Sequence, residues 1–277
     1  RAANDKPCYE ITLGGLIGGH SGVDINKGRL NANKLMGELL SAVKIPFNIV
    51  SVAGGAKDNV ITRECKCIIA TDRYSGDFCD CIISKKPASE PDLFIEVKAV
   101  DTSDTVFDSE STERIVALIN ELPYGIIKMS PDIDGLVQTS LNLGVLKCED
   151  CSAFASFGVR SSVGADKTQL LECLKAICDK FSGEFNEYGH YPAWEYRKNS
   201  PLRDVMENVY SDTFGKKPQI EIIHAGLECG LFASKISDFD AVSIGPDLYD
   251  IHTARERLSV SSTKSLYEYI LRSLERL

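Results

Sequence analysis

Two histidines near the C-terminal end of the chain each follow an apolar run that is typical of a strand. The run at 220–223 predicts a buried strand; His224 comes directly after it, and Glu228 lies between two glycines just beyond. The run at 241–244 predicts a second strand, with His252 a few residues later. Strand ends that bring imidazole and carboxylate groups to one edge of a sheet favour a ligand-binding site in α/β proteins. The alternative is that these are ordinary polar loop residues.

Three further polar residues stand out in the first two thirds of the chain. The loop 14–22 is rich in glycine, allows another group to approach the backbone closely, and presents His20. The loop 54–61 exposes Asn59, and Arg160 lies near the end of an apolar, strand-like segment.

The elements that must position these residues follow from the hydrophobic pattern. Predicted strands lie at 9–13, 47–52, 65–71, 93–100, 136–146 and 153–161, and predicted helices at 31–43, 109–122 and 167–181. Residues 77–85 are ambiguous and suit a short helix. The strand–helix–strand and strand–strand–helix orders of these elements indicate α+β sandwich subdomains rather than a doubly wound sheet.

An irregular stretch at 183–200 predicts a boundary between two domains. After it we expect a helix at 201–214, the two strands introduced above and a last helix at 262–277. The predicted division is therefore 1–185 and 186–277, an α+β domain followed by a small α/β piece.

The composition limits the possible partners. The 277 residues carry a formal net charge of −9, which argues against nucleic acid and anionic membranes as main partners. No segment approaches the roughly 20 apolar residues of a membrane span. Ten cysteines could indicate a disulfide framework or a zinc site, but a C-x-C spacing is a weak zinc signal and the chain is long enough to build its own core. We expect reduced, mostly buried thiols in a cytoplasmic protein.

Several motifs give the chain a strong resemblance to one family. They are Gly15-Leu16-Ile17-Gly18-Gly19-His20-Ser21-Gly22, Gly28-Arg29-Leu30-Asn31-Ala32-Asn33, Thr139-Ser140-Leu141-Asn142-Leu143-Gly144, Tyr191-Pro192-Ala193-Trp194 and, most specifically, Ile223-His224-Ala225-Gly226-Leu227-Glu228-Cys229-Gly230. Together they resemble the aminoacyl-histidine (Xaa-His) dipeptidases, carnosinase-like zinc metallopeptidases, in order along essentially the whole chain.

The resemblance implies a fold, and it also implies that the N-terminal half of the family's catalytic domain is not part of this chain. Family members have an α/β catalytic domain interrupted by an α+β lid with ferredoxin-like subdomains, and two zinc ions held mostly by the N-terminal half. This chain resembles most of the lid followed by the C-terminal part of the catalytic domain. It starts at Arg1 rather than Met, so we expect that its start has been removed. Because the family's bridging carboxylate and general-base glutamate are not in this chain, the resemblance also implies that the chain alone is inactive.

The resemblance also assigns roles to residues. His252 resembles the C-terminal zinc ligand, although His-Thr-Ala-Arg-Glu replaces the family's usual His-Ser-Pro-Asp-Glu. His20 resembles the lid histidine that hydrogen-bonds the developing oxyanion, and Arg160 the arginine that binds the substrate carboxylate. Asn59 would orient the substrate. Gly226 and Glu228 would line its pocket, with Glu228 facing an amine.

Each assignment has a structural alternative. Arg160 could be an exposed charge at a strand end, Asn59 a turn residue and Glu228 a helix-start cap. For the whole chain, the expected function is part of a cytoplasmic zinc dipeptidase that hydrolyses Xaa-His dipeptides by metal-activated water, with a possible homodimer. The alternative is a non-catalytic relative that serves as a binding or dimerisation module.

Overall fold

The computed structural model describes residues 1–72, 87–131, 133–221, 228–249 and 255–277. The chain folds as two compact units, Arg1–Tyr188 and Gly189–Leu277.

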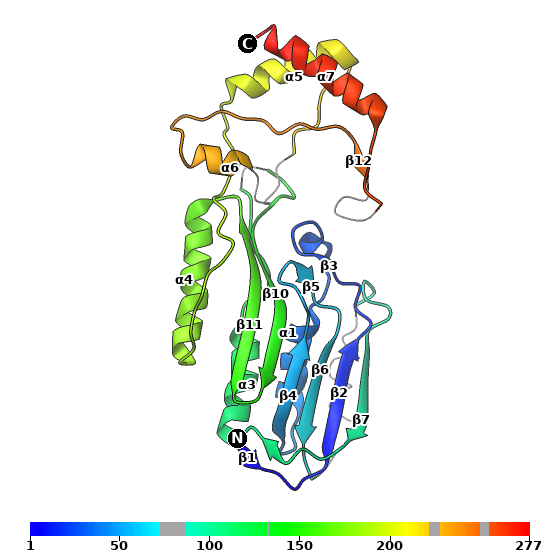
Figure 1. The fold of residues 1–277 in the computed structure, drawn as a ribbon, viewed down its shortest axis with the longest axis vertical. Coiled ribbons are helices and arrows are strands. Elements are labelled where there is room, and N and C mark those ends of the chain that lie inside the picture. Colours follow the sequence, from blue (N-terminus) through cyan, green and yellow to red (C-terminus); the bar gives the residue numbers. More distant parts are fainter. Residues whose placement is uncertain (73–86, 132, 222–227, 250–254) are drawn as a thin grey trace. The chain divides into compact units, whose positions relative to one another are not determined.

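Unit 1 is built on one large antiparallel sheet (Figure 1). Its strands are β2 (Cys8–Gly14), β4 (Asn48–Gly54), β6 (Cys65–Ala70), β7 (Phe94–Val100), β9 (Gly125–Met129), β10 (Val137–Glu149) and β11 (Ser152–Ser161). They run in the order β11-β10-β4-β6-β2-β7, and β9 also pairs with β10. The part β4-β6-β2-β7 has the strand order of a ferredoxin-like subdomain, as expected. The long β10–β11 hairpin extends the sheet beyond it.

Two helices, α1 (Ala32–Ala42) and α3 (Ser109–Glu121), pack on one face of this sheet, and α4 (Gly164–Lys180) lies against β11 (Figure 1). The start of α1 is fixed by Asn31, whose side chain accepts the N–H groups of Asn33 and Lys34. Asp108 caps α3 in the same way. The apolar faces of α1 and α3 bury Met36, Leu39 and Ile119 with the inward side chains of the strands, and this forms the main core. The predicted mixed α/β class is therefore confirmed.

The regular elements in the described part of unit 2 are mainly helices. Helices α5 (Pro201–Phe214) and α7 (Val260–Leu274) pack together around Met206, Val209 and Tyr269, and the Tyr269 hydroxyl donates to the Met206 carbonyl at 2.9 Å. The short helix α6 (Glu228–Ala233) and a ribbon of β12 (Leu248–Tyr249) with β13 (Arg257–Leu258) complete it.

The two strands predicted in this unit are not found. Residues 219–221 and 241–247 have no regular secondary structure, and 222–223 lie outside the described residues. A strand needs a neighbour to pair its backbone groups, and β12–β13 is the sheet within the described part of unit 2. Val242 instead packs against α5 and α7. The two-strand edge inferred from the apolar runs is therefore wrong for these residues.

The eight described cysteines are all free thiols. Cys65, Cys67 and Cys148 lie in the core, where burial, and then the neighbouring cysteines, raise the pKa of Cys65 and Cys67; burial alone raises the pKa of Cys148 to about 12. Such thiols cannot form the reactive thiolate at neutral pH. Cys151 and Cys173 are exposed.

We therefore expect two classes of cysteine towards a thiol reagent. Brief treatment of the folded chain at pH 7.5 should modify Cys151 and Cys173, while Cys65, Cys67 and Cys148 react only after unfolding. Mass-spectrometric peptide mapping measures this directly. Fast modification of Cys65 or Cys67 without denaturant would show that the sheet opens locally.

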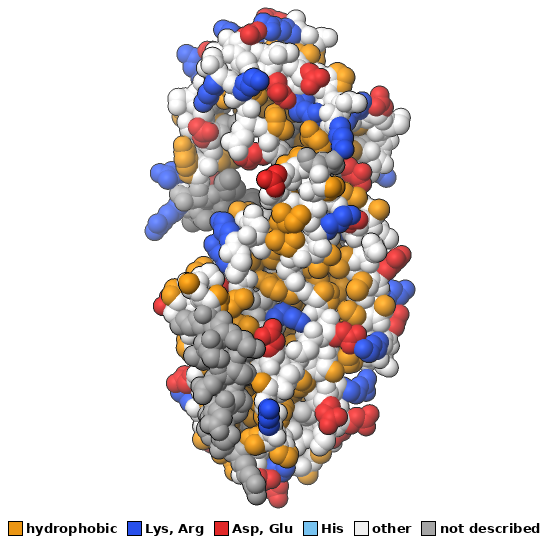
Figure 2. Space-filling view, turned by 180° about the vertical axis from the view of Figure 1, so that it is seen from behind, with side chains coloured by type: hydrophobic (Ala, Val, Ile, Leu, Met, Phe, Trp, Pro, Cys, Tyr) orange, Lys and Arg blue, Asp and Glu red, His pale blue; other side chains and the backbone are white. Residues whose placement is uncertain are grey.

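The described helices and surface have few features that would exclude a class of partner. No described helix has the length and apolar character to cross a membrane. On the face shown in Figure 2, Lys and Arg side chains are interspersed with Asp and Glu rather than gathered into a basic area.

Candidate functional site

His20 lies in the glycine-rich loop between β2 and α1, and the structure places it beside Asn59. The short strand β3 (Gly19–His20) pairs with β5 (Val60–Ile61), so that His20 is opposite Val60. The next backbone N–H, that of Ser21, donates to the Asn59 carbonyl at 2.9 Å. Two loops from distant parts of the sequence are thus joined at the residues predicted to bind substrate.

The loop that carries Asn59 is itself anchored to the β10–β11 hairpin. Asn142 of β10 donates through its side-chain amide to the carbonyls of Asp58, at 2.6 Å, and Val60, at 2.8 Å. Gly158 lies opposite Asn142 on β11, and a Cβ there would come within 2.8 Å of the Asp58 carbonyl oxygen. The loop therefore sits directly on the hairpin, which fixes its position against the strand that carries Arg160.

Arg160 meets the His20 loop at Gly22. A Cβ placed on Gly22 would lie 3.1 Å from Arg160 Cζ and 3.1 Å from His20 Cε1, so the glycine is packed closely between the two side chains. Arg160 is half-buried, and its Nε is buried without a hydrogen-bond partner among the described residues. Arg160 is therefore not an exposed charge at a strand end. An unsatisfied, buried donor on a cation favours an anionic ligand.

Asp58 is the acidic residue whose negative charge acts on the Arg160 guanidinium. Burial lowers the pKa of Arg160, while the charge of Asp58 acts in the opposite direction, and a guanidinium remains protonated in either case. The Asp58 carboxylate accepts the Tyr188 hydroxyl at 2.9 Å, and Tyr188 is also 2.7 Å from the Ser156 hydroxyl.

The cluster of His20, Asn59 and Arg160 combines an imidazole, an amide and a guanidinium. A guanidinium binds a carboxylate by two parallel hydrogen bonds, and an imidazole N–H or an amide can donate to a carbonyl oxygen. The arrangement is suited to a small molecule that carries both groups.

The remaining predicted site residues belong to unit 2 or lie outside the described residues. Glu228 is exposed and is the first residue of α6, so it also occupies the position of a helix-start residue. Burial and then the charge of Glu228 raise the pKa of Tyr191. Gly226 and His252 fall in segments that the structure does not describe.

The described residues offer no metal site. Within 1–72, 87–131, 133–221, 228–249 and 255–277, no three His, Cys, Asp or Glu side chains are grouped so that they could hold an ion. A zinc site needs three or four protein ligands, and the described residues do not supply such a set.

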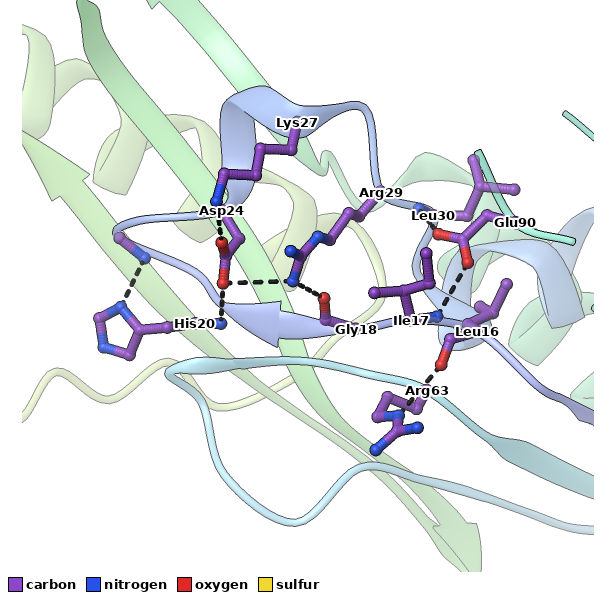
Figure 3. Close-up of polar contacts among 11 residues, drawn as sticks. Leu16, Ile17, Gly18, His20, Asp24, Lys27, Arg29, Leu30, Arg63 and Glu90 are labelled. Atoms are coloured by element: carbon purple, nitrogen blue, oxygen red, sulfur yellow. Dashed lines mark hydrogen bonds and ion pairs between the residues drawn. The ribbon is translucent and has the colours of Figure 1, made fainter. Parts of the chain in front are cut away.

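The sequence reading missed Asp24 and Glu90, which hold the His20 loop (Figure 3). Asp24 is four residues after His20, a spacing that could have suggested a local side-chain contact. Glu90 is separated from the loop by 60 or more residues, and no sequence pattern links them.

Comparison with known proteins identifies a family and two relatives that the chain resembles. Residues 11–84 match the family model of the M20 peptidase dimerisation domain. The chain is 31% identical, over 264 residues, to the cytosol non-specific dipeptidase of Escherichia coli (strain K12). The aligned region covers 92% of this chain and 54% of that protein.

A solved structure, the aminoacylhistidine dipeptidase from Vibrio alginolyticus, matches with a TM-score of 0.92 and 30% identity over 100% of this chain and 59% of that one. The chain spans somewhat more than half the length of these relatives. The family model and these two relatives support an assignment of the chain to the M20 peptidases, and among them to the aminoacylhistidine dipeptidases.

Proposed function

We propose that this chain is the lid and the C-terminal catalytic portion of a dipeptidase that hydrolyses Xaa-His dipeptides. Unit 1 would be the lid and unit 2 part of the catalytic domain, close to the division expected at 185. The observation that carries the proposal is the close approach of His20 and Arg160 at Gly22, with Asn59 joined to the same loop through the bond from the Ser21 N–H to its carbonyl. The names of the relatives support the reaction class, a peptidase that acts on dipeptides.

In this proposal each side chain has one task. Arg160 binds the C-terminal carboxylate of the dipeptide, and His20 donates a hydrogen bond to the peptide oxygen as its negative charge develops. Asn59 orients the peptide group between them. Gly226 and Glu228 line the pocket around the N-terminal residue, where Glu228 would pair with the amine.

The metal, the location and the assembly are part of the same proposal. Zinc, two ions in the complete enzyme, would supply an activated water, and His252 is the residue of this chain that would serve as a ligand. The word cytosol in the name of the Escherichia coli relative supports a cytoplasmic location. The substrate is a small dipeptide, and neither nucleic acid nor membrane is expected as a partner.

The match of residues 11–84 to a dimerisation domain supports a homodimer formed through unit 1. Sedimentation equilibrium of the purified chain should give a mass near twice that of one chain at micromolar concentration. A mass that stays at one chain up to the highest soluble concentration would contradict this assembly.

The function is tested with a chimaera in which residues 1–277 replace the matched segment of the Escherichia coli dipeptidase. We expect the chimaera to hydrolyse glycyl-histidine in the presence of zinc, with the parent dipeptidase as positive control. The 277-residue chain by itself should show no turnover with or without zinc, because a zinc site needs three or four protein ligands and this chain supplies His252.

The outcomes separate the two functional readings. A chimaera that folds, as judged by circular dichroism and its melting temperature, but does not hydrolyse any dipeptide would favour the non-catalytic module, which the dimerisation-domain match also supports. Chelator-sensitive turnover by the 277-residue chain alone would contradict the proposed division of ligands.

A further inference from the structure

The loop that carries His20 is tied together at its tip by the carboxylate of Asp24 (Figure 3). The backbone N–H of His20 donates to Asp24 Oδ2 at 2.9 Å, and Arg29 Nη1 is 3.2 Å from the same oxygen. Lys27 Nζ is 2.8 Å from Oδ1. Arg29 also donates to the Gly18 carbonyl, on the other side of the loop.

These contacts define the state of Asp24. Burial by itself would raise the pKa of this carboxyl, but the hydrogen bonds from Lys27 and from the His20 backbone, with the charge of Arg29, lower it below its ordinary value. The carboxylate is therefore ionised at neutral pH. Gly19 has a φ of +138°, and a Cβ there would collide with Asp24 and Arg29, so the ion pair requires glycine at this position.

A second carboxylate, Glu90, closes the loop at its base (Figure 3). Its Oε2 accepts the N–H of Ile17 at 2.8 Å, and its Oε1 accepts the N–H of Leu30 at 3.0 Å. The side chain is 0% exposed. One buried side chain thus joins the residues where the loop begins and ends, and both oxygens are hydrogen-bonded, as a buried carboxylate requires.

The imidazole ring of His20 is held by a hydrogen bond from a backbone amide. The backbone N–H of Gly22 donates to His20 Nδ1 at 3.2 Å. A backbone amide can only donate, so Nδ1 must keep its lone pair, and the hydrogen of the neutral ring is then on Nε2. The Gly22 amide is held in place by the turn that follows, in which the N–H groups of Val23 and Asp24 donate to the His20 carbonyl.

We propose that Asp24 and Glu90 are positioning residues that hold His20 in the Nε2–H tautomer, so that the donor of the neutral ring is Nε2–H. Asp24 fixes the backbone on either side of the ring, and Glu90 fixes the two ends of the loop. The proposal rests on the proposed function only for the identity of the acceptor, the peptide oxygen of the substrate. The tautomer itself depends on the hydrogen bonds described above.

The alternative is that both carboxylates only stabilise the loop, without any effect on the ring. Thermal stability cannot separate the two, because either role lowers it when a carboxylate is removed. The tautomer can, because it changes only if the Gly22 amide leaves Nδ1. Nitrogen-15 NMR distinguishes the two neutral tautomers from the shifts of the two ring nitrogens and their couplings to ring hydrogens.

The experiment uses the full 277-residue chain labelled with 15N-histidine, at a pH where the rings are neutral. The signals of His20 among the four histidines are assigned by their loss in His20→Gln. We expect His20 of the unchanged chain to show the Nε2–H tautomer alone. Asp24→Ala should give the tautomer mixture that the same histidine shows in denaturant.

Glu90→Gln should act in the same direction, because the amide oxygen can accept one of the two N–H groups and its NH₂ opposes the other. Lys27→Met is the matched control. It removes a charge from the same carboxylate but leaves the bonds to His20 and Arg29, so the tautomer should not change. Asp24→Asn, which keeps the size of the side chain, is the second variant if Asp24→Ala does not fold.

The proposal is overturned if folded Asp24→Ala (or Asp24→Asn, where the alanine variant does not fold) and Glu90→Gln chains both keep a single Nε2–H tautomer, or if the unchanged chain shows the mixture. Its failure is distinguishable from that of the proposed function. A fixed tautomer together with a His20→Ala chimaera of normal kcat would leave the positioning intact and refute the role of His20 in hydrolysis.

Discussion

Replacement of His20 by alanine in the chimaera is expected to lower kcat by about 10²–10³-fold and to change KM only slightly. Attack of water on the peptide carbonyl places negative charge on its oxygen, and a donor that meets this charge stabilises the transition state more than the bound dipeptide. A loss of that kind appears in kcat and in kcat/KM to the same extent. Steady-state kinetics with glycyl-histidine measure both constants.

The matched control is His190→Ala, because His190 is an exposed histidine that makes no hydrogen bond to a predicted site residue within the described part of the chain. It should keep kcat within a factor of about two, as expected for a surface substitution. Near-normal kcat in the His20→Ala chimaera would mean that the glycine-rich loop is only structural. His20→Gln refines the result, since its amide is a donor of similar reach but without the fixed orientation that Asp24 and Gly22 give to the imidazole.

The sheet of unit 1 could be predicted from the sequence because its strands and helices are long and strongly patterned. The predicted helix at 109–122 is α3, and the predicted pair at 136–146 and 153–161 is the β10–β11 hairpin. The segment 241–244 was misassigned because its apolar pattern resembles a strand, whereas strand formation depends on a partner that the pattern does not reveal.

The site was less predictable than the fold. His20, Asn59 and Arg160 could be named separately from the family resemblance, but their meeting depends on the β3–β5 pairing and on the close packing at Gly22, which only the tertiary structure shows. Glu90 could not be found at all, because its partners are backbone amides and leave no mark on the residue types of the loop.

Arg160→Ala should have a different kinetic signature from His20→Ala, with a KM raised by roughly 10²-fold and a kcat that changes little. The carboxylate of a dipeptide carries the same charge before and during hydrolysis, so its contact with a guanidinium contributes equally to the bound substrate and to the transition state. A hydrogen bond to a charged group contributes about 1.5–3 kcal/mol, and each 1.4 kcal/mol corresponds to a factor of ten. Loss of such uniform binding appears in KM.

The KM should depend on the geometry of the side chain at position 160 as well as on its charge. Lysine keeps the charge but cannot form two parallel hydrogen bonds, so Arg160→Lys is expected to have a KM between those of the unchanged chimaera and Arg160→Ala. Arg276→Ala is the control, because Arg276 is an exposed arginine that pairs with Asp212 on the surface of unit 2 and should leave both constants unchanged.

A change in the substrate tests the contact directly. The C-terminal amide of glycyl-histidine has no carboxylate, so the unchanged chimaera should hydrolyse it with a much higher KM than the free dipeptide. For this amide, Arg160→Ala should cost far less than it costs for the free dipeptide, because the interaction is already absent. Equal losses with both substrates would place Arg160 away from the carboxylate, and its buried Nε, which has no partner among the described residues, would then require another anionic partner.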